Sequence, residues 1–217
     1  MQVYNVLIGC DQKYYEDWGI HLIRSIRYFN PWITCHVHVV NPIHVEKIDG
    51  VEYTTEHRDF PNDTVKIGYL QCVRFLKVAE KFTDNDLVMT LDADTICTRK
   101  TTPQAFEEAT KHKITMLRHL KAKHWLAGLV TYGEAGFKDE LAAKLLEKPI
   151  EQWAPFWDQT ILAELSKKYT YNEQPARLFW MSIGKNGNQS VFLTLKGNQK
   201  EKSKYLDTYK KFMVRNI

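Results

Sequence analysis

The chain has 217 residues, the size of one ordinary domain, and its apolar (44%) and charged (26%) fractions are average for globular proteins. This composition excludes a disordered chain and a fibre. No run of 18 apolar residues occurs, so we expect no transmembrane helix. The first residues lack a basic region followed by a long apolar one, so we expect no secretory signal and a cytoplasmic location. The four cysteines form no CxxC pair and are expected to be reduced.

The net charge of +4 is concentrated near the C-terminus. Residues 196–217 hold seven Lys/Arg and two acids, which leaves 23 basic and 24 acidic residues elsewhere. We therefore predict one domain over residues 1–200 and a basic, weakly helical tail over 201–217. Such a tail suits phosphate, an anionic polymer or peripheral contact with a membrane surface, or it is simply a solvated helix. Because the rest of the chain is nearly neutral, nucleic-acid binding is not expected.

The first elements alternate between strand and helix. Residues 3–9 (VYNVLIG) form an apolar run that predicts a buried strand. Residues 15–29 have apolar side chains at helical spacing, and Asn30-Pro31 ends this helix.

A second strand is predicted at residues 35–40 (CHVHVV), where valines alternate with histidines. His36 and His38 share one face, which we interpret as an exposed outer face of the strand.

The later elements continue this alternation. Thr102-Pro103 has the pattern of a helix cap followed by a first helical residue. Strand and helix segments in alternation predict an α/β fold with a mostly parallel central sheet flanked by helices. Further strands are predicted at residues 87–91, 114–120, 126–132 and 191–195, and helices at 63–82, 103–110, 134–147 and 157–169.

The sharpest local signal is LVMTLDADT, residues 87–95. A buried strand leads to Asp92 and Asp94, and open α/β sheets bind ligands at such strand ends. In an extended segment, residues i and i+2 point to the same side, so both carboxylates can face one ion. Two hard oxygen donors suit Mn²⁺ or Mg²⁺, which commonly takes substrate phosphates as further ligands. The alternative is an acidic loop without a ligand.

Two enzyme classes use this local pattern. In haloacid-dehalogenase-type phosphatases, hhhhDxDxT supplies a nucleophilic and an acid/base aspartate; in nucleotide-sugar transferases the carboxylates hold a metal under the donor diphosphate. The phosphatase motif normally lies on the first strand and has a distant acidic pair downstream. Here Asp92 follows at least two predicted strands, and no GDxxxD or DD pair occurs later. The transferase is therefore favoured.

Several motifs in order carry a family resemblance: GCDQKY (9–14), CVRFL (72–76), the DxD segment, LAGLV (126–130), WDQ (157–159) and TLKGNQK (194–200). The chain resembles GT-A glycosyltransferases, and within them the glycogenin and lipopolysaccharide galactosyltransferase family, from about residue 3 to residue 200. The resemblance implies a single Rossmann-like GT-A domain, a UDP-sugar donor and retention of anomeric configuration.

The resemblance also implies roles at the nucleotide. Asp11 would accept a hydrogen bond from the uridine base; its alternative role is that of a turn or cap residue. Arg74 would reach the donor site and pair with Asp92, Asp94 or the diphosphate; its alternative is a surface position. Ala93, between the two aspartates, belongs to the same donor-binding set.

Around the donor sugar, small residues at Ala127 and Gly128 would let backbone approach the sugar. Leu126 stands where the family often has Asn, so one sugar contact is missing. Asp158 would bind sugar hydroxyls and Gln159 would lie near the anomeric carbon; these two are the expected catalytic residues. The alternative for Asp158 is to cap its helix.

The last motif departs from the family at one position. Gly197 and Lys200 match residues that contact the diphosphate, and Lys196 adds charge beside them. Thr194 stands where the family has its third metal ligand, a histidine.

The sequence thus predicts a metal-dependent glycosyltransferase that moves a sugar from a UDP-sugar to an unknown glycan, lipid or protein acceptor. Clamping the leaving diphosphate with a cation on Asp92 and Asp94, together with Arg74 and Lys200, is the expected source of catalysis. Two alternatives remain: a phosphatase that uses Asp92, and a non-catalytic nucleotide-sugar-binding domain.

Overall fold

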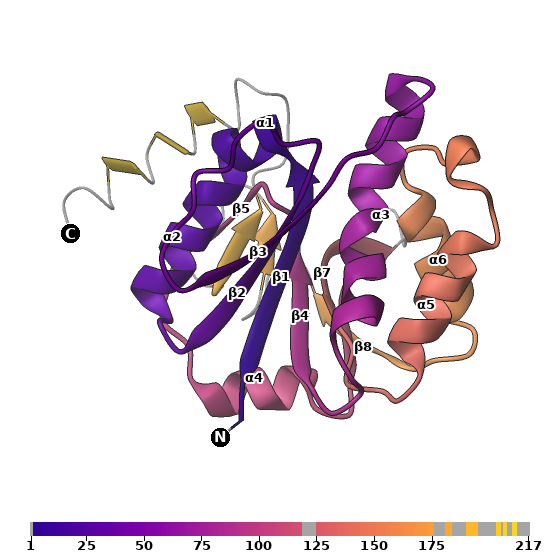
Figure 1. The fold of residues 1–217 in the computed structure, drawn as a ribbon. Coiled ribbons are helices and arrows are strands. Elements are labelled where there is room, and N and C mark those ends of the chain that lie inside the picture. The colour runs from indigo at the N-terminus through magenta and orange to yellow at the C-terminus, as the bar shows by residue number, and fades with distance from the viewer. Residues whose placement is uncertain are drawn as a thin grey trace.

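The computed structural model describes residues 2–118, 125–175, 181–183 and 190–194 and, in the tail, 203–204, 206–207 and 210–211. A seven-stranded sheet with the order β3-β2-β1-β4-β7-β6-β8 forms its centre (Figure 1). The strands are β1 (Tyr4–Asp11), β2 (Ile33–Val40), β3 (Val51–Glu56), β4 (Leu87–Leu91), β6 (Ile114–Arg118), β7 (Trp125–Thr131) and β8 (Tyr171–Pro175).

Strands β3, β2, β1 and β4 are all parallel, so their carboxyl ends meet at one edge of the sheet. Strand β7 is antiparallel to both β4 and β6, and β6 is parallel to β8. A smaller sheet with the order β5-β10-β9 combines β5 (Thr95–Cys97), β10 (Phe192–Thr194) and β9 (Met181–Ile183). The predicted α/β class with a mostly parallel sheet is confirmed.

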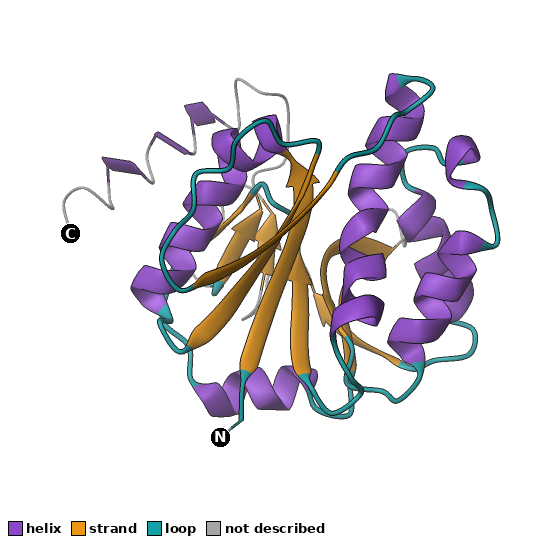
Figure 2. Cartoon of the chain, in the orientation of Figure 1, coloured by secondary structure: helices purple, strands orange, loops and turns teal. Residues whose placement is uncertain are grey.

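Helices cover both faces of the large sheet (Figure 2). Apolar residues of α2 and α4 pack on one face, and those of α3, α5 and α6 pack on the other. The helical segments are α1 (Gln12–Tyr14), the π-helix η1 (Tyr15–Gly19), α2 (Ile20–Phe29), α3 (Asp63–Lys81), α4 (Pro103–Thr110), α5 (Phe137–Leu146), the 3-10 turn η2 (Ile150–Gln152) and α6 (Trp157–Leu165).

One predicted helix end agrees with the structure and two differ. Thr102 caps α4 as expected, because its side chain accepts a hydrogen bond from the Ala105 N–H. Helix α5 begins at Phe137 instead of residue 134, because Gly136 just before it has a left-handed φ of 77°. Helix α6 ends at Leu165, four residues before the predicted end, and continues as a turn.

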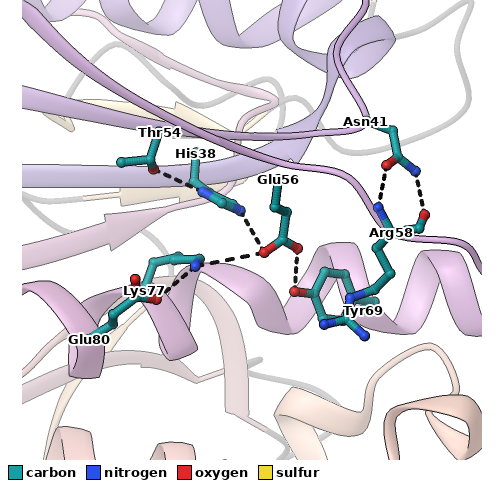
Figure 3. Close-up of polar contacts among 8 residues, drawn as sticks. All are labelled: His38, Asn41, Thr54, Glu56, Arg58, Tyr69, Lys77 and Glu80. Carbon is teal, nitrogen blue, oxygen red and sulfur yellow. Dashed lines mark hydrogen bonds and ion pairs between the residues drawn. The ribbon is translucent and has the colours of Figure 1, made fainter.

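The exposed placement predicted for His36 and His38 is wrong. Their side chains are only 5% and 1% exposed, because β3 pairs with β2 and α3 covers the same face. His38 Nδ1 lies 2.9 Å from Thr54 Oγ1, and its Nε2 lies 3.5 Å from Glu56 Oε2 (Figure 3). The alternation of valines and histidines correctly predicted that His36 and His38 share one face of the strand. It could not show that α3 covers that face.

Glu56 joins three elements at this place (Figure 3). Its carboxylate accepts a hydrogen bond from Tyr69 Oη and lies 3.7 Å from Lys77 Nζ, both on α3, and it faces His38 on β2. Burial raises the pKa of Glu56, but the bonds from His38 and Tyr69 outweigh it and hold the pKa at about 2. An ionised Glu56 therefore fastens α3 to the edge of the sheet.

All four cysteines are buried, and none forms a disulfide. Among the described helices, none combines the length and the apolar character needed to cross a bilayer.

Candidate functional site

A cleft of about 530 Å³ opens where β1 and β4 end. The chain proceeds from β1 outward to β2 and β3 and then returns to β4 on the other side of β1, which makes this the switch point of the sheet. Ligands of open α/β sheets bind at such a point. The cleft is lined by Gly9, Cys10, Asp11, Tyr14, Asp63, Lys66, Ile67, Leu70, Gln71, Arg74, Asp92, Ala93 and Asp94.

Both DxD aspartates lie in this cleft. The Asp92 N–H donates to the Gly128 carbonyl at 3.0 Å, so β7 holds the motif in place. Asp94 is 6% exposed and forms a hydrogen bond with the Tyr14 phenol. Burial and the Asp94 and Asp92 charges raise the pKa of Tyr14, so the phenol stays protonated and donates. Tyr14 was not singled out from the sequence, although its place three residues after Asp11 was a signal.

Arg74 lies beneath the aspartates and is 4% exposed. Nη1 lies 2.9 Å from Asp92 Oδ1, while Nη2 lies 3.7 Å from Asp158 Oδ2 and donates to the Ala127 carbonyl at 3.0 Å. Burial opposes the charge of Arg74, but the Asp92 and Asp158 carboxylates raise its pKa overall. The alternative of a surface arginine is therefore wrong.

Gly9 explains how α3 comes so close to β1. A Cβ at this position would lie 2.8 Å from Val73 Cγ1 and 3.1 Å from the Arg74 backbone nitrogen. Only a residue without a side chain lets the middle of α3 rest on the end of β1. This contact brings Arg74 to the DxD segment.

Asp158 reaches the same network from the first turn of α6 and is 2% exposed. Its Oδ1 accepts the Gln159 N–H at 2.8 Å, while its Oδ2 faces Arg74. Phe156, with a left-handed φ of 69°, occupies the N-cap position of α6, so Asp158 is the second residue of the helix, although its carboxylate does accept a first-turn N–H. Gln159 is half-buried.

Asp11 does cap a helix and lines the cleft as well. Its Oδ1 accepts the Tyr14 N–H at 2.9 Å, at the start of α1, and its Oδ2 lies 2.9 Å from Lys66 Nζ. The cap role and a ligand-facing position therefore coexist. Lys66 was not identified from the sequence, because nothing local to α3 indicates its partner on β1.

The small residues of β7 lie behind the DxD motif. Ala127 and Gly128 are buried, and their carbonyls bind Arg74 and Asp92. Ala93 lines the cleft directly. Leu126 is 8% exposed within the core and pairs with Leu117 on β6.

Thr194 is brought to the DxD segment by the small sheet. Strand β10 is antiparallel to β5, with Thr194 opposite Thr95, the residue that follows Asp94. The hydroxyls of Thr95 and Thr194 are both buried and have no hydrogen-bond partner within the described part of the chain. Lys196, Gly197 and Lys200, which follow β10, lie outside the described residues.

The available donors fit a hard divalent cation, although the set is incomplete. In the described ranges, no three His, Cys, Asp or Glu side chains gather as metal ligands. Asp92 and Asp94 line the cleft with carboxylate oxygens, whereas the buried hydroxyls of Thr95 and Thr194 do not line it. An all-oxygen set suits Mg²⁺ or Mn²⁺ that takes further ligands from a phosphate or water.

Comparisons with known proteins show which solved structures have a similar fold. No family model matches the sequence, and no curated protein matches it. The fold resembles the apo form of the glycosyltransferase GlyE from Streptococcus pneumoniae TIGR4, with a TM-score of 0.54 and 17% identity over 80% of this chain and 45% of that one. It also resembles a glycosyltransferase involved in glycosylation of the major capsid of PBCV-1, with a TM-score of 0.62 and 12% identity over 94% of this chain and 99% of that one.

The chain thus spans less than half of the pneumococcal enzyme but nearly all of the capsid-modifying one. The fold that both share with it is the one that the sequence motifs imply. The chain has a GT-A-like glycosyltransferase fold.

Proposed function

We propose that the protein is a glycosyltransferase that transfers a sugar from a nucleotide-diphosphate sugar, with a UDP-sugar as donor, to a glycan, lipid or protein acceptor. One observation carries this proposal: in a chain with a glycosyltransferase fold, buried Arg74 and the carboxylates of Asp92 and Asp94 converge on the cleft at the switch point of the sheet.

The chemistry needs positive charge where the diphosphate leaves. Breaking the anomeric C–O bond places negative charge on the diphosphate and positive charge on the sugar ring. Arg74 is buried and held from two sides, so its guanidinium stabilises this charge without reorganising. By the family resemblance, Gly197 and Lys200 would contact the diphosphate, and Lys196 would add positive charge near the leaving group.

A divalent cation, Mn²⁺ or Mg²⁺, would be held by Asp92 and Asp94 and would neutralise charge on the donor diphosphate. Tyr14 orients the Asp94 carboxylate by its hydrogen bond. Thr194 stands where the family has an imidazole, so the protein would contribute oxygen ligands only.

On the sugar side, Asp158 and Gln159 are the proposed catalytic residues. Asp158 fixes Arg74 and orients the Gln159 backbone, and the Gln159 amide steadies the donor sugar. Ala127 and Gly128 provide the small residues behind the motif. With retention of configuration, the departing phosphate accepts the proton of the acceptor hydroxyl.

The test is slow donor hydrolysis, which needs no acceptor. We expect the protein with Mn²⁺ to release UDP from at least one of a panel of UDP-sugars. Asp94→Asn should lower this rate by roughly a hundredfold, because a neutral amide binds the cation more weakly than a carboxylate and is a weaker acceptor for the Tyr14 phenol. Asp139→Asn is the matched control, since this aspartate is 60% exposed on α5.

Three results would contradict the proposal. Undiminished hydrolysis by Asp94→Asn would remove the metal role, and phosphate release from simple monoesters that is lost in Asp92→Asn would indicate a phosphatase. UDP binding without turnover of any UDP-sugar would favour a non-catalytic binding domain. The replacement of the family's histidine by Thr194 supports that alternative.

A further inference from the structure

Lys66 and Asp11 form an ion pair inside the cleft. Lys66 Nζ lies 2.9 Å from Asp11 Oδ2, and both residues line the cleft from different elements, α3 and the end of β1. The Lys66 side chain is 38% exposed and that of Asp11 19%, so both remain accessible to a ligand.

Each partner is held in place by its own element. Asp11 Oδ1 accepts the Tyr14 N–H at 2.9 Å, which fixes the carboxylate at the end of β1. The first turn of α3 is capped by Asn62, whose side chain accepts the Val65 N–H at 3.0 Å, and Val65 is buried. The backbone N–H of Lys66 donates to the Asn62 carbonyl at 3.1 Å. The two charged groups are therefore presented side by side before any ligand arrives.

The pair retains hydrogen-bonding capacity on both sides. A carboxylate has about four acceptor positions and an ammonium has three donors, so after their mutual contact Asp11 can still accept and Lys66 can still donate. A ligand complementary to this pair has a hydrogen-bond donor directly beside an acceptor. The imide edge of uracil presents its ring N–H and then a C=O, whereas cytosine has the reverse order at the same two positions, a bare ring nitrogen and then an amino group.

We propose that Lys66 is a specificity-determining residue that, together with Asp11, recognises the imide edge of the donor's uracil base. Asp11 accepts from the base N–H and Lys66 donates to the neighbouring carbonyl. Cytosine bound in the same register as uracil would place its ring nitrogen against the carboxylate and its amino group against the ammonium. The inference rests on the proposed function and extends it to the residue that selects the base.

Two other roles are possible for a lysine in this place, and they make different predictions. A half-exposed ion pair with no ligand contributes little, so its removal would change no affinity. A lysine that binds the diphosphate would serve UDP and CDP equally, because the two nucleotides differ only at the base.

The experiment is calorimetric titration of the whole chain with UDP and with CDP in one Mg²⁺-containing buffer. We expect wild type to prefer UDP, and Lys66→Met to reduce the ratio of the two affinities roughly tenfold, the usual effect of losing one charged hydrogen bond. Lys66→Gln should lose discrimination as well, because an amide can donate to uracil and accept from cytosine. Lys66→Arg, which keeps a cationic donor, should retain the preference.

Lys81→Met is the matched control. It removes a lysine from the same helix that also pairs with a carboxylate on a neighbouring strand, 2.6 Å from Glu52 Oε2, but away from the cleft. An equal loss of UDP and CDP affinity in Lys66→Met, or no change in either, would overturn the role of Lys66 while leaving the proposed function intact. Failure of wild type to bind any uridine nucleotide would overturn both.

Discussion

At the scale of single residues, the site is organised around one buried cation. Arg74 contacts Asp92, Asp158 and the Ala127 carbonyl, so its guanidinium connects α3, the DxD segment, α6 and β7. A buried charge is tolerated only when it is paired and hydrogen-bonded. The same contacts that permit this burial also hold the guanidinium toward the cleft.

His36 illustrates a second buried titratable group, away from the site. The Asn5 amide donates to the Leu87 carbonyl at 3.3 Å, so its Oδ1 accepts from His36 Nε2 at 2.9 Å. This leaves His36 Nδ1 to face Glu52 Oε2 at 3.3 Å. Burial, aided by Lys81 and opposed by Glu52, lowers the pKa of His36 to about 4.

We predict that acid weakens the fold through His36. Between pH 6.5, the ordinary histidine pKa, and about 4, the unfolded chain binds the proton and the folded chain does not. The free energy of unfolding should therefore fall as pH drops through this window, by up to about 3 kcal/mol. His21, whose pKa burial also lowers to about 4, contributes in the same direction.

Urea unfolding at several pH values tests this expectation. His36→Gln should flatten the pH dependence between 6.5 and 4, and adding His21→Gln should flatten it further. His57→Gln, at an exposed position, is the control. An unchanged slope in His36→Gln would show that His36 does not carry the effect.

At the scale of elements, α3 determines the geometry of the cleft. It rests on β1 at Gly9, is fastened to β3 through Glu56, and carries Lys66 and Arg74 into the site. Its packing and its function therefore depend on the same contacts.

We predict that Gly9→Ala affects both. The added Cβ would meet Val73 Cγ1 at 2.8 Å and force α3 away from β1. Overpacking of this kind costs about 1–3 kcal/mol of unfolding free energy. UDP affinity should fall as well, because Arg74 follows Val73 directly.

Denaturant unfolding and UDP titration measure the two effects. Combining Gly9→Ala with Val73→Ala, which removes the contacted methyl, should recover part of both. If Gly9→Ala left stability and UDP affinity unchanged, the close approach of α3 to β1 would not govern the site.

Two of the strands missed in the sequence show why local patterns failed there. Strand β3 (VEYTTE) is polar and lies at the edge of the sheet, so it lacks the apolar run that marked β1 and β4. Strand β5 has only three residues, too few for a periodic pattern. Both depend on pairing with distant strands rather than on local preference.

At the scale of the whole molecule, the late strand β10 returns to the site. Its pairing with β5 places Thr194 opposite Thr95, beside the DxD segment that lies about a hundred positions earlier in the chain. Thr194 stands where the family has a histidine, and its hydroxyl is buried without a hydrogen-bond partner among the described residues. At this position the proposed metal site therefore differs from the family.

We predict that Thr194→His tightens Mn²⁺ binding in the presence of UDP. An imidazole is a better ligand for Mn²⁺ than a hydroxyl, and we expect a gain of roughly tenfold, about 1.4 kcal/mol. Calorimetry with Mn²⁺ at saturating UDP measures it. Thr194→Ser, which keeps the hydroxyl, should behave like wild type, and an unchanged affinity in Thr194→His would place Thr194 away from the cation.

The sequence by itself determined β1, β2, β4 and the helices between them, the α/β class, and the delivery of Asp92 and Asp94 from the end of a buried strand. These follow from local periodicity and from rules of parallel sheets, which need no knowledge of distant partners. The resemblance in motif order likewise singled out Asp11, Arg74, Ala93 and Asp158, which the fold gathers around one cleft and its floor.

Only the tertiary structure decided which polar groups are buried and what they contact. His36 and His38 are buried because the unpredicted strand β3 pairs beside β2 and the helix α3 packs over the same face. Lys66 meets Asp11, and Arg74 meets Asp158, across 55 and 84 positions of sequence respectively. Such contacts arise when crossover connections bring separate elements together, and a pattern within one element contains no information about the element that will pack against it.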